Sequence, residues 1–119
     1  MATIRVARVY DQATDQDGYR VLVDRLWPRG MNRSDAQIDE WCMQVAPSTT
    51  LRKWYGHDRQ RFAEFRRRYR SELQLGEQAE ALTHLRQLAK HQTLTLLTAS
   101  RDVDISAAVV LAELLQSPS

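Results

Sequence analysis

The segment DRLWPRG, residues 24–30, places one carboxylate close to two guanidinium groups, with Asp24 beside Arg25 and Arg29 further on. An aspartate can orient water or transfer a proton, and an arginine binds carboxylate or phosphate through paired hydrogen bonds. The combination predicts a site for a small anion, with Asp24 as a candidate for proton transfer. A salt-bridge network that fastens the loop is the alternative interpretation.

His57 follows Trp54, Tyr55 and Gly56 and precedes Asp58, so it is the histidine that lies in a loop among aromatic residues. An imidazole can act as a general acid or base near neutral pH. A solvated or helix-capping histidine is the alternative in such a turn. We therefore keep His57 as a second candidate for proton transfer, without concluding that the protein is an enzyme.

Other familiar chemistry is absent from the sequence. No histidine and carboxylate spacing is typical of a metal site, and no glycine-rich phosphate loop, C-x-x-C or G-x-S-x-G motif occurs, so we predict no metal and no cofactor. Cys42, between Trp41 and Met43, is expected to be a small buried residue rather than a nucleophile. Trp27, before Pro28, could stack on a ring of a ligand, although a packing anchor is the commoner role.

Three segments have the composition of β-strands. Residues 4–9 alternate apolar and basic side chains, residues 19–24 are rich in valine, and residues 94–100 form a nearly continuous apolar run with threonines. The last two have the pattern of strands that are covered on both faces. The proline and the glycine of DRLWPRG require the chain to leave the sheet there.

Amphipathic periodicity and capping residues predict four helices. Ser48, after Pro47, can cap the first, and Asp58 can cap the second. The helices are expected over about residues 49–55, 58–73, 79–90 and 105–115. Residues 36–45 fit either a strand or a short helix, for which Ser34 could serve as the cap, and we favour an extended segment.

The order of these elements predicts an α/β fold, a single small three-layer domain over residues 1–119 with a mostly parallel central sheet and helices packed on it. Parallel strands point their carboxyl ends to the same edge of a sheet, where α/β proteins commonly bind ligands. If the strands are neighbours, several polar side chains meet at that edge: Tyr10, Asp24, Arg25, Arg29, Ser100 and Arg101.

Arginine supplies nearly all of the positive charge, because only Lys53 and Lys90 among 17 basic residues are lysines, yet the net charge is only +2. Six arginines follow one face of the predicted helix 58–73: Arg59, Arg61, Arg66, Arg67, Arg68 and Arg70. This face provides the alternative function, a binding module for nucleic acid or for a protein partner. Glu64 and Glu72 interrupt it, and a solvated face is the commoner role.

The sequence contains no apolar run of about eighteen residues and no apolar segment typical of a secretory signal. We therefore expect a cytoplasmic protein without a membrane partner. The sequence does not indicate the oligomeric state.

Four stretches of the chain resemble the YeaO-like family of small bacterial proteins, which carry domain of unknown function 488: DGYRVLVDRLWPRG, APSTTLRKWYGH, FAEFRRRYRSEL and LTLLTASRD. The resemblance covers residues 6–115. It implies a compact α/β domain of the bacterial cytoplasm and brings no established reaction, substrate or cofactor. Many relatives carry an Asn-His pair at the start of the last helix, where this chain has Ser106 and Ala107. If that histidine acts in chemistry, this protein either lacks the activity or uses another residue, such as His57.

The residues and the resemblance together predict a site for a small anionic molecule that bears phosphate or carboxylate. We expect proton transfer, if any, to involve Asp24 and His57. The expected ligand contacts are Arg8, Tyr10, Arg20, Arg25, Trp27, Arg29, Arg52 and Ser100.

Overall fold

Strand β4 (Leu94–Thr98) occupies the middle of the sheet, and all five of its residues are buried. In the computed structural model, which describes residues 3–116, β4 pairs with β1 (Ile4–Arg8) and with β2 (Tyr19–Leu22). The short strand β3 (Glu40–Trp41) pairs with β2. All three pairings are parallel, in the order β1-β4-β2-β3, so the predicted α/β fold with a parallel sheet is confirmed.

Both faces of the sheet are covered. Successive residues of β2 and β4 point to opposite faces, and a hydrophobic core lies on each. Val21 and Leu96 lie opposite each other in the register and belong to the larger core. Leu22 and Leu97 form the next pair and belong to a smaller core on the other face. All four are fully buried, which explains the nearly continuous apolar run of these strands.

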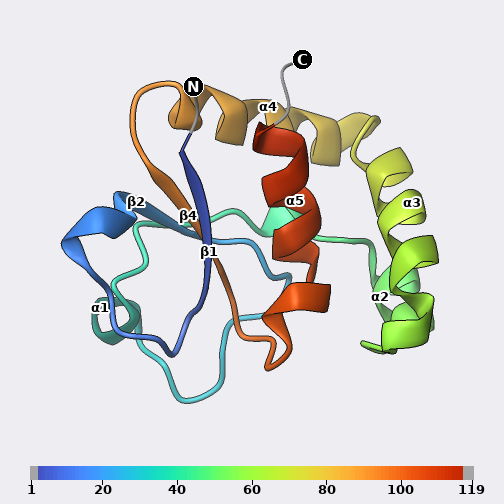
Figure 1. Ribbon diagram of the computed structural model, residues 1–119, viewed down its shortest axis with the longest axis horizontal. Helices are drawn as coiled ribbons and strands as arrows, with labels where there is room; N and C mark the ends of the chain where they lie inside the picture. Colours follow the sequence, from blue (N-terminus) through green and yellow to red (C-terminus); the bar gives the residue numbers. More distant parts are fainter. Residues whose placement is uncertain (1–2, 117–119) are drawn as a thin grey trace.

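Within residues 3–116, five α-helices pack around the sheet. Figure 1 shows α4 across the top, α5 beside β1 on its right, α2 and α3 at the right, and α1 at the left. Their bounds are Arg33–Ala36 for α1, Thr49–Tyr55 for α2, Phe62–Glu72 for α3, Gly76–Ala89 for α4 and Ala107–Gln116 for α5.

Two predicted helix caps are confirmed. The Ser48 hydroxyl accepts a hydrogen bond from the Leu51 amide at 3.1 Å and starts α2. The Asp58 carboxylate accepts one from the Gln60 amide at 3.0 Å and starts the 3-10 turn that leads into α3. Side-chain caps therefore fix the start of α2 and the start of the turn that leads into α3.

Residues 36–45, which fitted either a strand or a helix, contain both kinds of structure. Helix α1 ends at the start of this stretch, β3 follows, and a 3-10 turn at Met43–Val45 completes it. The favoured extended segment is therefore correct only for β3. The proposed cap Ser34 is wrong, because the Asn32 side chain accepts the capping hydrogen bond from the Asp35 amide at 2.8 Å.

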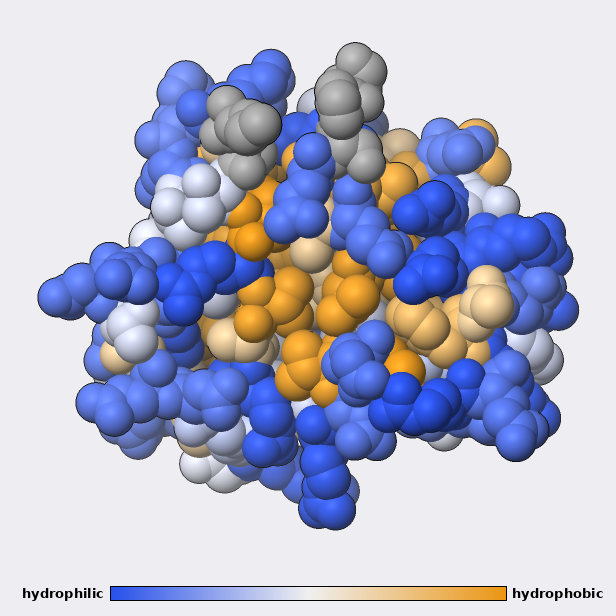
Figure 2. All heavy atoms as spheres, in the orientation of Figure 1, coloured by the Kyte–Doolittle hydropathy of each residue, from blue (hydrophilic) through white to orange (hydrophobic). Residues whose placement is uncertain are grey.

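The apolar face of α3 packs against the larger core as its periodicity predicts. Phe65, Tyr69 and Leu73 are all buried, and the Tyr69 hydroxyl donates to the Val45 carbonyl. On the face formed by β1 and α5, Figure 2 shows apolar side chains gathered in the middle and charged side chains around them.

Candidate functional site

The carboxyl ends of β1, β4 and β2 lie side by side. The Val9 amide donates to the Thr98 carbonyl at 2.8 Å, and the Val23 amide donates to the Leu97 carbonyl at 3.1 Å. The residues that follow these strands therefore meet at one edge of the sheet.

A cavity of about 540 Å³ opens at this edge. The loops after the three strands form one side, and α2, the turn after it, Phe65 of α3 and Ala107 of α5 form the other. Most of the predicted site residues line it: Tyr10, Asp24, Arg25, Trp27, Arg29, Arg52, His57 and Ser100.

Arg8 and Arg20 are not among the lining residues. The Arg8 guanidinium donates to the Ser100 carbonyl at 3.2 Å and lies over the Tyr10 ring, 5.0 Å from its centroid, so it supports the cavity from outside. Arg20 is buried in the sheet, where it pairs with Asp17 and donates to the carbonyls of Ala36 and Gln37 at the end of α1. It therefore fastens the end of α1 to β2.

Asp24 is held by two donors from the end of β4. One carboxylate oxygen accepts from the Thr98 hydroxyl at 2.8 Å and the other from the Ala99 amide at 2.8 Å. Burial raises the pKa of Asp24 above its ordinary value, although these hydrogen bonds and the nearby His57 lower it in part. Both oxygens therefore already have protein partners, which restricts Asp24 as an acceptor for a ligand.

A chain of hydroxyl groups connects this carboxylate with His57. The Thr98 hydroxyl lies 3.2 Å from the Ser100 hydroxyl, and the latter lies 3.1 Å from Nε2 of His57. Asp24 and His57 are thus coupled through two hydroxyls instead of touching each other. This geometry differs from that of a nucleophile-base-acid triad, in which the carboxylate bonds directly to the imidazole.

The backbone presents His57 in a restricted conformation. Its φ angle is 55°, and within residues 3–116 only Gln37 is another non-glycine residue with a positive φ. The preceding Gly56 also has a φ of 55°, so two consecutive left-handed residues turn the chain at the end of α2. The exposed imidazole then stacks on the buried Tyr55 ring, with 5.4 Å between centroids.

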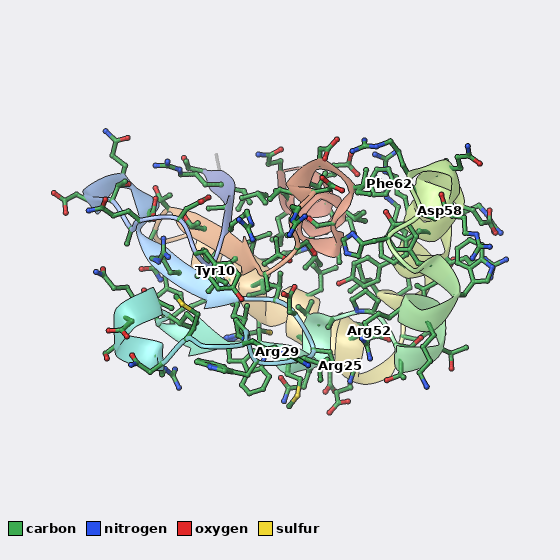
Figure 3. All side chains as sticks on the ribbon, turned by 90° about the horizontal axis from the view of Figure 1, so that it is seen from below. Tyr10, Arg25, Arg29, Arg52, Asp58 and Phe62 are labelled. Carbon is green, nitrogen blue, oxygen red and sulfur yellow. The ribbon has the colours of Figure 1, made fainter. Side chains whose placement is uncertain are left out.

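Three arginines line the cavity: Arg25, Arg29 and Arg52. Figure 3 shows them along one side of the molecule, with Tyr10 beyond Arg29. Within residues 3–116, none of the three makes an ion pair, and Asp24 is the only carboxylate that lines the cavity. The cavity therefore carries an excess of positive charge.

Arg25 is the fixed member of this group. Its guanidinium donates to the Pro47 carbonyl at 3.1 Å and to the Ala46 carbonyl at 3.3 Å. Those carbonyls are held in turn, because Gln78 donates to Ala46 at 2.9 Å and the Ser48 amide donates to Glu72 at 2.9 Å. Arg29 and Arg52 have no such side-chain hydrogen bonds with the described residues and are exposed.

Trp27 is anchored in the protein. Its indole N–H donates to the Met31 carbonyl at 2.7 Å, and its ring meets that of Trp41 edge to face, with 5.2 Å between centroids. Packing, the commoner of the two predicted roles, is therefore present, and Trp27 also lines the cavity. The loop is also fixed by the Trp41 indole, which donates to the Asp24 carbonyl at 2.8 Å.

The arginine face of α3 and of the 3-10 turn before it is largely ion-paired. Each of the six arginines predicted there forms an ion pair, among them Arg67 and Arg68 with Glu64, and Arg66 and Arg70 with Glu113. Arg59 pairs with Asp104, and Arg61 with Asp58. This face therefore offers less free positive charge than its sequence indicates.

The other reactive side chains lie away from the cavity. Cys42 is buried as predicted, and burial raises the pKa of its thiol to about 11, so it is a poor nucleophile near neutral pH. His84 on α4 lies 2.8 Å from a carboxylate oxygen of Glu40. In the part of the chain that the structure describes, no three histidine, cysteine or acidic side chains are grouped to hold a metal ion.

Several lining residues had no chemical signal in the sequence. Ala46, Pro47 and Ala99 have no polar side chain, and Phe65 was assigned only to the core. Thr98, which holds Asp24, lies inside an apolar strand and could be found only from the strand order.

The protein is thus a parallel α/β protein with an arginine-lined cavity at the carboxyl edge of its sheet. The chain belongs to the DUF488 family, since it matches the model described as the inactive DUF488-N3 subclade over residues 3–118. The predicted resemblance to YeaO-like proteins is thereby confirmed.

Relatives of nearly the same length support this assignment. The chain is 45% identical over 114 residues to the uncharacterized protein YeaO of Escherichia coli, covering 96% of this chain and 97% of that protein. It is 48% identical over 112 residues to the uncharacterized protein Rv3073c of Mycobacterium tuberculosis, covering 94% and 92% of the two chains. No solved structure matches the chain.

Two further findings bear on the predictions. Ala107, which stands where the resemblance leads us to expect a histidine, lines the cavity, so a histidine there would project toward the same space as His57. No helix within residues 3–116 combines the length and the apolar character that crossing a bilayer requires.

Proposed function

We propose that the protein binds a small anion in the cavity at the carboxyl edge of the sheet, without turning it over. The observation that carries this proposal is that Arg25, Arg29 and Arg52 line one cavity and have no carboxylate partner within residues 3–116. A guanidinium in such a position is well suited to a phosphate or carboxylate, which it can bind through two parallel hydrogen bonds.

Each arginine has a different part in this proposal. Arg25 is preorganised by the Ala46 and Pro47 carbonyls, so little side-chain entropy is lost when it binds an anion. Arg29 and Arg52 are free to close on the ligand from the loop after β2 and from α2. The Ser100 hydroxyl and the His57 ring supply further polar contacts.

The absence of turnover is supported by the state of the acid and base candidates. Asp24 has a hydrogen-bond donor on each oxygen, and His57 is joined to it only through Ser100 and Thr98. The description of the subclade as inactive favours the same conclusion. Asp24 and His57 then organise the wall of a binding site instead of transferring protons.

Nucleic-acid or protein binding through α3 receives less support. The six arginines of α3 and of the turn before it all form ion pairs and share four carboxylates, Asp58, Glu64, Asp104 and Glu113, so a phosphate backbone would have to compete with these pairs.

The proposal is tested by thermal unfolding with inorganic phosphate against chloride at equal ionic strength. Phosphate at ten times its dissociation constant should stabilise the protein by about 1.4 kcal/mol, or roughly 5 °C for a chain of this size. The double variant Arg29→Ala/Arg52→Ala should keep its melting temperature without phosphate and lose the shift.

The two lysines of the chain provide a matched control. Lys53 is exposed next to Arg52 and does not line the cavity, and Lys90 is exposed after α4. The variant Lys53→Ala/Lys90→Ala changes the net charge equally and should keep the phosphate shift. Equal losses in the two double variants, or no shift in the wild-type protein, would show that the cavity is not an anion site.

A further inference from the structure

We infer that the anion bound in this cavity carries a flat apolar group, as an aryl phosphate or an aromatic carboxylate does. This inference rests on the proposed function and adds the class of ligand. The geometry points to it because the lining of the cavity, apart from the three arginines and a few other polar side chains, is largely apolar.

The size of the cavity exceeds what an inorganic ion needs. Pockets for organic ligands commonly measure about 300–1,000 Å³, and this one measures about 540 Å³. A phosphate held by Arg25, Arg29 and Arg52 would leave much of the space to the rest of the ligand.

The remaining lining is apolar and partly exposed. Leu26 is 61% exposed and Tyr10 is 43% exposed, and both line the cavity. Within residues 3–116 they are two of four large hydrophobic residues with such exposure, and the other two, Met43 and Leu75, do not line it. An apolar group bound against Leu26 and Tyr10 would remove this surface from water.

The polar groups at the cavity are mostly engaged with the protein. The Tyr10 hydroxyl donates to the Arg29 carbonyl at 3.3 Å, and the indole N–H of Trp27 donates to Met31. Each carboxylate oxygen of Asp24 already accepts one hydrogen bond from the protein. A ligand body rich in hydroxyl groups, such as a sugar, would therefore find few partners, and its polar atoms would be desolvated without compensation.

The rings in the cavity lining favour a flat ligand. Tyr10 carries the Arg8 guanidinium over its ring, and the His57 ring lies against Tyr55, so two walls present planar groups held by stacking. Aromatic and guanidinium planes favour planar ligands through offset stacking and cation–π contact.

The inference is tested by calorimetric or fluorescence titration of the wild-type protein with inorganic phosphate, glycerol phosphate and phenyl phosphate. Phenyl phosphate should bind at least about tenfold more tightly than the other two, because only its body can cover the apolar lining. Benzoate against acetate provides the same comparison for carboxylates.

Two exposed leucines provide matched variants. Leu26→Ser should weaken the binding of phenyl phosphate about threefold or more and leave inorganic phosphate unchanged, whereas Leu75→Ser, at an exposed leucine that does not line the cavity, should change neither. Equal affinities for phenyl and inorganic phosphate would overturn this inference and leave the proposed function standing. If phenyl phosphate keeps the same advantage in affinity over inorganic phosphate in Leu26→Ser as in Leu75→Ser, the inference is also overturned. If none of the probes binds, both proposals are overturned.

Discussion

The hydroxyl oxygen of Ser100 lies 3.1 Å from Nε2 of His57. Because the Asp24 carboxylate accepts the Thr98 proton, the Ser100 hydroxyl can donate to Thr98 and accept from His57. The buried carboxylate thereby orients a chain that ends at an exposed imidazole.

This chain predicts the tautomer of His57. In its neutral form the ring should carry its proton on Nε2, and the Ser100→Ala variant should populate both tautomers, with a change in stability below about 1 kcal/mol because the exposed ring can bond to water. Nitrogen-15 NMR of the imidazole measures this directly. A predominance of the Nδ1–H form in the wild-type protein would refute the proposed direction of the chain.

The pH dependence of stability should reveal the burial of Asp24. Folding raises the pKa of Asp24, so the folded protein binds this proton more tightly than the unfolded chain, and falling pH favours the folded state. The wild-type protein should gain stability relative to Asp24→Asn as the pH falls from the raised pKa toward the ordinary value of 3.8, with a constant difference outside that window.

Urea denaturation of both proteins at a series of pH values measures this difference. The exposed Asp15→Asn variant serves as the control for the loss of an aspartate. A wild-type advantage that instead grows with rising pH would mean that the pKa of Asp24 is lowered by folding.

Glu72 should stabilise the wall that holds Arg25. Its carboxylate accepts from the Ser48 amide, the Ser48 hydroxyl and the Gln78 side chain. Glu72→Gln replaces one acceptor by a donor that faces these groups, so we expect a loss of about 1–3 kcal/mol in the free energy of unfolding and weaker phosphate binding. Chemical denaturation and phosphate titration test this, with the exposed Glu77→Gln as control, and equal behaviour of the two variants would exclude a positioning role.

The paired arginines of α3 should not bind nucleic acid strongly. Titration with single- and double-stranded oligonucleotides at two salt concentrations should give no salt-sensitive binding at protein concentrations up to about 100 µM. Binding that weakens steeply with salt and disappears in Arg67→Ala/Arg70→Ala would instead favour α3 as the functional surface.

Much of the fold follows from local sequence patterns. The apolar runs of β2 and β4 indicated strands covered on both sides, and Ser48 and Asp58 marked real helix starts. Residues 36–45 were harder because α1 is held by Asn32 and β3 by two pairs with β2, and neither short element has a periodicity of its own.

The site was predictable where the chemistry is local to a strand end, as for Asp24 and Arg25. On the opposite wall, Arg52 and His57 were among the predicted site residues, whereas Phe65 was not, because α3 reaches the cavity through tertiary packing. Arg20 shows the reverse case, because this arginine of β2 was expected to contact the ligand but pairs with the buried Asp17. Arg20 lies near the amino end of β2, whereas Asp24 follows its carboxyl end, so position along the strand separates the two side chains.

The most direct test of anion binding in this cavity is a crystal structure of the protein with tungstate, a heavy analogue of phosphate whose anomalous signal locates it. We predict tungstate in the cavity, within hydrogen-bonding distance of Arg29 or Arg52 and beside Arg25. An empty cavity in crystals that bind tungstate elsewhere, such as along α3, would contradict the proposal.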